Sequence, residues 1–208
     1  GMDVEALPLY WPEGVSQNGR DWVLENITAG HVNNLMGEVA LFAPLGNWDE
    51  LVLESLDGTF TFTGVDAHYL RPMPPVVGVD GTATFSPQGL VIEMQGGASG
   101  DIVLGSGTLD ITGLNAKDQV LAVEFTANGP LPSVFSLLNH PRVALIDKLG
   151  LNTEGAVGGV SARARFAFPL LADLTFDEMD VSAQGDLTDT GLIKVLLGQD
   201  VTGANVKL

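Results

Sequence analysis

Residues 51–126 contain six apolar-rich segments set apart mainly by glycines and prolines: LVLESL (51–56), GTFTFTGV (58–65), GTATF (81–85), LVIEM (90–94), DIVLGSGTLDITGL (101–114) and VLAVEFT (120–126). In the second of them, threonines at 59, 61 and 63 alternate with Phe60 and Phe62. Successive side chains of a strand point to opposite faces, so this period of two predicts strands with one polar and one apolar face.

The flanking segments extend this pattern into a fold class. Alternation returns after residue 155, most clearly over 160–168, so strands are expected at about 32–126 and 155–208. Apolar residues at helical spacing predict an N-terminal helix at about 16–28 and a helical insert at about 131–149, which Pro141 breaks. We therefore expect a mainly β (α+β) single domain over 1–208: a curved antiparallel meander forming a groove or partial barrel.

Composition excludes several classes of function. The 208 residues carry a formal net charge of −17, and Arg20 and Arg71 are the only basic residues among the first hundred. A surface that follows phosphates needs clustered Lys and Arg, so nucleic acid is not an expected partner. The sequence has no cysteine and no run of about 18 apolar residues that would predict a membrane-spanning helix. Gly1 before Met2 resembles a tag remnant, and we expect the chain to be a piece of a longer protein.

Residues with catalytic or metal-binding chemistry do not form a recognised pattern. His31, His68 and His140 lie far apart and outside any metal-ligand spacing, so structural roles are expected for them. Five acidic residues form the one notable cluster, for which solvated charge is the simpler interpretation and a glycosidase pair the alternative: Asp177, Glu178, Asp180, Asp186 and Asp189. No enzyme activity, catalytic residue, cofactor or metal is predicted.

Three long segments, in this order, resemble AsmA-like bacterial envelope proteins of the YhdP type. The first is LPLYWPEGVSQNGRDWVLENITAGHVNNLMGEVAL (7–41), with its Trp-Pro pair, Arg-x-Trp-Val helix and terminal glycine. The second is LDGTFTFTGVDAHYLRPMPPVVGVDGTATF (56–85), and the third is GPLPSVFSLLNHPRVALIDKLG (129–150), which a Gly-rich strand ending in FPL (168–170) follows. The resemblance covers nearly the whole chain through the order of its elements, and no single motif is highly specific.

The resemblance implies a location and a function. Proteins of this family are held in the inner membrane by an N-terminal helix, which we expect to lie in another part of the full-length chain, and they project into the periplasm. Their curved sheets have an apolar concave face and are thought to carry phospholipid acyl chains or to support outer-membrane assembly. The expected partners are therefore a phospholipid or other acyl lipid, the remaining parts of the full-length chain, envelope proteins, and a second copy of the fragment bound through edge strands.

The pattern of alternation predicts which residues line the apolar face. The predicted lining comprises Phe60, Phe62, Ile92, Met94, Leu109, Ile111, Leu121, Val123, Phe125, Phe166 and Phe168. Two alternatives remain open at this point. The same side chains would also fill a closed β-sandwich, which would make the chain a structural or protein-interaction module. An enzyme acting on envelope glycans through the 177–189 carboxylates is the third hypothesis.

Overall fold

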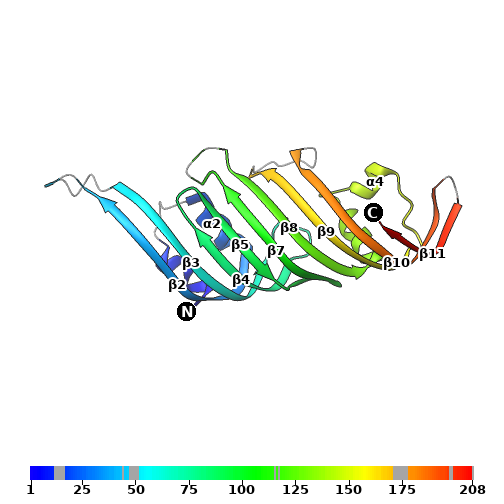
Figure 1. Cartoon of the computed structure of the whole chain (residues 1–208), viewed down its shortest axis with the longest axis horizontal. Helices are drawn as coiled ribbons and strands as arrows, with labels where there is room; N and C mark the ends of the chain where they lie inside the picture. Colours follow the sequence, from blue (N-terminus) through cyan, green and yellow to red (C-terminus); the bar gives the residue numbers. More distant parts are fainter. Residues whose placement is uncertain are drawn as a thin grey trace.

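The chain forms one antiparallel sheet in which most strands pair with their neighbours in sequence (Figure 1). This computed structural model describes residues 1–11, 17–43, 45–46, 52–114, 116, 118–170, 178–196 and 199–207. The strands are β1 (Met2–Asp3), β2 (Ile27–Phe42), β3 (Val52–Ala67), β4 (Val76–Phe85), β5 (Gly89–Gln95), β6 (Ala98–Ser99), β7 (Ile102–Thr112), β8 (Val120–Pro130), β9 (Val157–Pro169), β10 (Asp180–Leu196) and β11 (Gln199–Lys207). Short β6 pairs with both β4 and β7, which closes a ring of four strands inside the open sheet.

Short helices occupy the two places where strand alternation is interrupted. Near the N-terminus, η1 (Val4–Ala6) and α1 (Leu7–Tyr10) precede α2 (Gln17–Asn26). Between β8 and β9 lie α3 (Leu131–Leu138) and α4 (Leu145–Leu149), separated by turns around Pro141. The expected fold class, with its N-terminal helix and kinked helical insert, is confirmed. The helical turns over residues 4–10 were not expected, and none of the helices in the described part of the chain has the length and apolar character needed to cross a bilayer.

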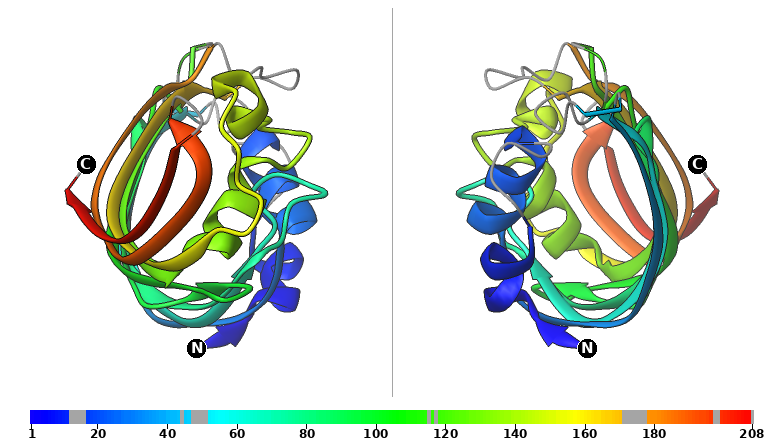
Figure 2. Two further views of the ribbon diagram at one scale, coloured as in Figure 1. Left: turned by 90° about the vertical axis from the view of Figure 1, so that its right-hand side faces the viewer. Right: turned by 90° about the vertical axis from the view of Figure 1, so that its left-hand side faces the viewer.

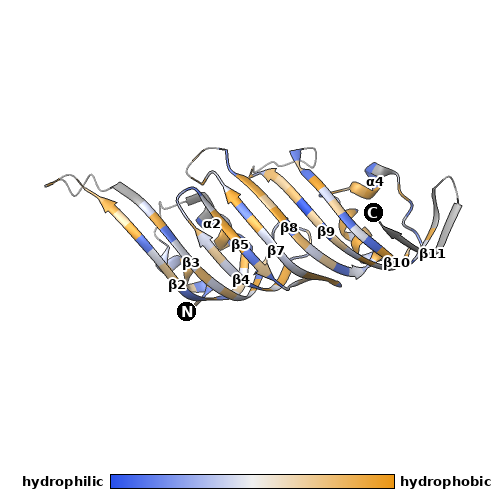
Figure 3. Ribbon diagram, viewed as in Figure 1, coloured by the Kyte–Doolittle hydropathy of each residue, from blue (hydrophilic) through white to orange (hydrophobic). Residues whose placement is uncertain are grey.

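The sheet is strongly curved, and the helices lie along its open side. Seen along the longest axis of the molecule, the strands bend into a U-shaped profile, and the helices η1, α1, α2, α3 and α4 lie along the open side of the U (Figure 2). Helix α3 contacts β8 and β9. Hydrophobic and hydrophilic residues alternate along the central strands (Figure 3), so the two faces of the sheet differ in chemistry.

One row of paired residues explains how side chains pack on the concave side of so strongly curved a sheet. Reading across six strands, β3 to β9, the residues directly opposite one another alternate between large and small: Phe62, Gly81, Met94, Gly107, Phe125 and Ala164. A Cβ atom added at Gly107 would lie 2.5 Å from Met94 Cε and 2.8 Å from Phe125 Cβ. Large side chains therefore occupy the space above the glycines. Side chains converge on the concave side of a bent sheet, so every second position has to be small.

This packing predicts that Gly107→Ala destabilises the fold. The new methyl group would also lie 2.6 Å from the carbonyl oxygen of Glu124, which is backbone and cannot rotate away. We expect a loss of about 1–3 kcal/mol in the free energy of unfolding, the usual cost of overpacking, measured by urea denaturation. Gly159→Ala is the matched control, because its nearest neighbour is the mobile Thr188 hydroxyl at 3.0 Å. Equal losses in both variants would contradict the packing explanation.

Candidate functional site

Three rows of apolar side chains run across the strands on one face of the sheet. Residues directly opposite one another in an antiparallel ladder point to the same face, so the register defines each row. The middle row consists of Phe60, Ala83, Ile92, Leu109, Val123, Phe166 and Val181. The rows on either side of it consist of Val32, Phe62, Gly81, Met94, Gly107, Phe125, Ala164 and Ala183, and of Gly58, Phe85, Leu90, Ile111, Leu121 and Phe168. We call these three rows together the apolar face; none of its members carries a charge.

All eleven residues of the predicted lining lie on this face. They come from five different strands, β3, β5, β7, β8 and β9, and the register brings them into adjacent positions. Sequence reasoning missed Phe85 and Leu90, which directly oppose one another beside the turn between β4 and β5. A hairpin register counted outward from Ser86 would have found them. It also missed Ala83 and Ala164, whose small side chains give no hydrophobic signal but leave the room that the larger ones use.

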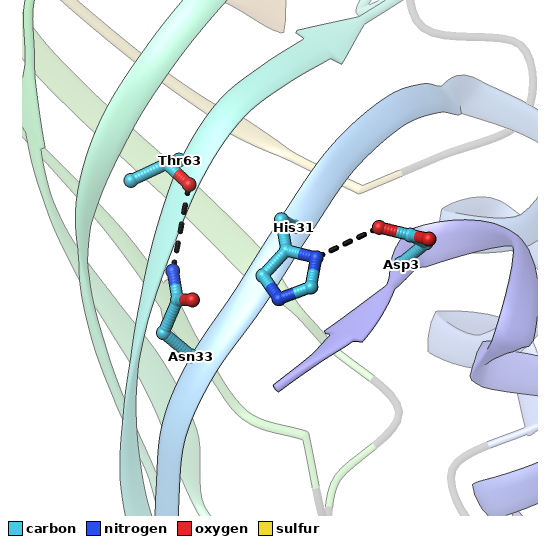
Figure 4. A network of polar contacts seen from close by, with 4 residues as sticks. All are labelled: Asp3, His31, Asn33 and Thr63. Atoms are coloured by element: carbon cyan, nitrogen blue, oxygen red, sulfur yellow. Dashed lines mark hydrogen bonds and ion pairs between the residues drawn. The ribbon is translucent and has the colours of Figure 1, made fainter.

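The opposite face is polar. Its central row consists of Thr61, Thr82, Glu93, Thr108, Glu124, Arg165 and Ser182. Most of these side chains are exposed, and Glu124 forms a 3.6 Å ion pair with Arg163 there. At the N-terminal end, Asn33 donates a 3.4 Å hydrogen bond to Thr63, while Asp3 and His31 approach to 2.7 Å (Figure 4). Charge and hydrogen-bonding groups thus gather on the side away from the apolar face.

Curvature, and not a second sheet, shields the apolar face. Its side chains are mostly half-buried, although the described residues contain no sheet that covers them. Neighbouring rings supply part of the contact: Phe60 lies 6.3 Å from both Phe62 and Phe85 between ring centroids, and Phe125 stacks on Phe166 at 6.0 Å. Side chains on a concave surface approach each other, whereas those on a convex surface spread apart. The apolar face is therefore the concave one.

Two groups of deeply buried apolar side chains lie on the concave side. Phe62, Val79 and Ala83 form a small buried cluster with exposed fractions of 6%, 7% and 0%. Ile102 and Leu104 on β7 and Leu187 on β10 are also buried, and Leu131 of α3 is 2% exposed. Helix α3 thus closes part of the open side where it contacts β8 and β9. Apart from Ala83, the middle row from Phe60 to Phe166 is only half-buried.

The total surface confirms how open the molecule is. Its accessible area is 12841 Å², whereas a compact monomer of this mass exposes about 9,300 Å². Phe60 and Phe166, whose full burial would have indicated a closed core, are only partly buried. The described residues form one sheet, so the β-sandwich of the alternative hypothesis does not form among them.

Two separate hollows lie outside the apolar face. One of about 740 Å³ is bordered by Asp3, Glu5, Ala6, Leu9, Gly30, His31 and Thr63. The other, of about 420 Å³, is bordered by residues of the helical insert and Thr153, including His140, whose Nδ1 accepts a 3.3 Å hydrogen bond from the amide of Arg142. Neither hollow includes a residue of the three rows, and both combine apolar with polar groups.

The candidate acidic cluster does not form a compact site among the residues that can be placed. Glu178, Asp180, Asp186 and Asp189 are exposed, and Asp177 lies outside the described residues. Asp180 and Asp186 share one face of β10 but stand about 20 Å apart at the usual rise per residue, beyond the about 5–9.5 Å that glycosidase carboxylates require. Glu178 and Asp180 are closer in sequence, but both are exposed and neither borders one of the two hollows. Within the described ranges, no three His, Asp or Glu side chains gather as metal ligands would.

The apolar face therefore stands as the one extended feature of the described molecule on which a binding function can be based. Its chemistry is uniform, because it offers hydrocarbon and aromatic surface without charge. Comparison of the chain with protein-family models, with curated proteins and with solved structures finds no match.

Proposed function

We propose that this protein binds the acyl chains of a lipid on its apolar face and acts without catalysing a reaction. The observation that carries the proposal is the set of three uncharged rows, half-buried by curvature and left without a covering sheet. Burying apolar surface yields about 25 cal/mol per Å², so an extended hydrocarbon that lies in contact with these rows gains free energy along its whole length. A polar headgroup would remain outside the rows, which offer it no partner.

The middle row of the apolar face is long enough to hold an acyl chain. The middle row crosses seven strands from β3 to β10, and six strand spacings of about 4.8 Å give about 29 Å. One leaflet of a bilayer contributes about half of the 30 Å hydrocarbon core, or about 15 Å per acyl chain. The row is therefore longer than one acyl chain and accommodates it along the direction of the row.

The resemblance to AsmA-like envelope proteins leads to a more specific proposal. In it, the chain is one section of a periplasmic lipid conduit or outer-membrane-assembly protein, attached through other parts of its full-length chain to the inner membrane. The order of sequence elements, the curved sheet and the uncharged concave face support this assignment. Lipid carriage would then need no motif of conserved polar residues, because selection depends on apolar contact.

A pair of asparagine substitutions tests the binding of acyl chains. Leu109 is a central member of the middle row, and its neighbour Thr108 points to the polar face. An amide facing hydrocarbon costs about 1–3 kcal/mol, so Leu109→Asn should weaken the binding of a fluorescent fatty acid by about tenfold. Titration of delipidated protein measures the change, and Thr108→Asn is the matched control with unaltered affinity.

A second substitution on the apolar face helps to distinguish a loss of binding from a loss of folding. Val123 lies opposite Leu109 in the middle row of the apolar face, and Val123→Asn would place an amide there without filling the space that the larger side chains use. We expect reduced uptake of the same probe, with native circular dichroism in all three variants. If the folded Leu109→Asn and Val123→Asn proteins both bind the probe as the unmodified protein does, the acyl chain does not lie on this face.

The salt dependence of binding gives a separate prediction. The three rows lack charged groups, so screening should not weaken the interaction, and salts that favour burial should strengthen it slightly. The affinity for the fluorescent fatty acid, measured at low and at high sodium chloride, should stay constant or rise. A steep fall with salt would indicate that a charged headgroup, bound elsewhere on the protein, dominates recognition.

A further inference from the structure

The second half of β2 is an open sheet edge. On one side β2 pairs with β3 along nearly its whole length, from Ile27 to Phe42. On the other side, β1 covers only His31 and Val32. Among the described residues, no strand pairs with residues 33–42 on that side. Their outward N–H and C=O groups are therefore available to another strand.

This edge is unusually apolar for one exposed to water. Six large side chains are more than half exposed: Leu35 (55%), Met36 (65%), Val39 (57%), Leu41 (55%), Phe42 (53%) and Leu45 (108%). Monomeric sheet proteins commonly protect such edges with lysine or proline. Residues 33–43 contain neither, and Glu38 is their only charged residue. Register shifts interrupt the pairing with β3 near Asn34 and Leu41, but Met36–Ala40 pairs regularly between them.

We propose that this edge binds a second copy of the chain, β2 against β2 in antiparallel orientation, with Val39 opposite Val39 of the partner. A twofold axis at Val39 places Met36 opposite Phe42 of the other copy and Glu38 opposite Ala40. A register centred on Glu38 would instead oppose two like charges, which is unfavourable in a cross-strand pair. The chosen register therefore pairs Val39 with Val39 and Met36 with Phe42, places Leu41 opposite Gly37, and sets each Glu38 opposite Ala40 rather than opposite the other carboxylate.

The exposed area is of the size that a stable dimer needs. Six apolar side chains that are each more than half exposed present several hundred Å², close to the about 800 Å² that each partner contributes to a standard interface. Backbone hydrogen bonds along the shared edge add to this burial. A polar or strongly charged partner would leave these apolar side chains without matching surface, which favours an identical edge as the occupant.

Pairing in this register would also join the two apolar faces. Val39 lies on the same face as Gly37, which is directly opposite Gly58 in the third row. Opposed residues in the new ladder share a face, so the concave side of one copy continues into that of the other. The dimer itself depends only on the edge, and it would form whether or not the face binds lipid.

A cysteine placed on the axis tests both the dimer and its register, because the chain has no cysteine of its own. Opposed residues in an antiparallel pair have Cα atoms about 4.5–5.5 Å apart, within the range that a disulfide spans. Val39→Cys should therefore cross-link to a covalent dimer under mild oxidation. Val103→Cys is the matched control, since Val103 on β7 is also 57% exposed and should remain monomeric on a non-reducing gel.

Light scattering and a lysine variant complete the test. The unmodified protein should elute with twice the mass of the 21.8 kDa chain, and Val39→Lys should elute as a monomer with an unchanged circular dichroism spectrum. A monomeric unmodified protein would overturn the proposal. So would a dimer that survives Val39→Lys and whose Val39→Cys form does not cross-link, because the contact would then lie on another surface.

Discussion

The structure depends on how side chains share space on the concave side of a bent sheet. When a sheet curves toward one face, the Cβ vectors on that face converge, and a row composed only of large residues would not fit. The chain meets this constraint by alternating large and small side chains across the strands. Phe62 lies over Gly81, and both Met94 and Phe125 lie over Gly107. The glycines that would weaken an isolated strand are thus what permits the curvature. The aromatic side chains that lie over these glycines supply part of the packing that the glycines lack.

The same constraint explains which features of the fold can be predicted from the sequence and which cannot. Alternation is a property of single strands, so Phe60, Leu109 and Phe166 could be assigned to one face without knowing which strands are neighbours. The alternation of size between strands is a property of register, and it becomes visible only when Phe62 is known to lie opposite Gly81. On sequence alone the glycines mark the limits of strand segments, and nothing in the sequence indicates their place in the rows.

Other features depended on tertiary structure in the same way. The turns at residues 4–10 follow a two-residue strand that pairs with β2, and no local pattern marks so short a pairing. Alternation in 32–43 predicted a strand but not its place at the sheet edge, because edge and interior strands can have the same composition. The exposed Leu35 and Phe42 would have been assigned to a core on sequence alone.

The direction of the rows has a consequence for how a bound hydrocarbon would behave. A guest that lies along a row crosses the strands one after another, and each crossing presents it with similar aliphatic or aromatic contact about every 4.8 Å. Displacement by one such step exchanges one set of contacts for a nearly equivalent one, so the free-energy profile along the row is shallow. If the proposed lipid binding holds, such a surface would keep its guest out of water while holding it loosely in position, which would suit transit better than storage.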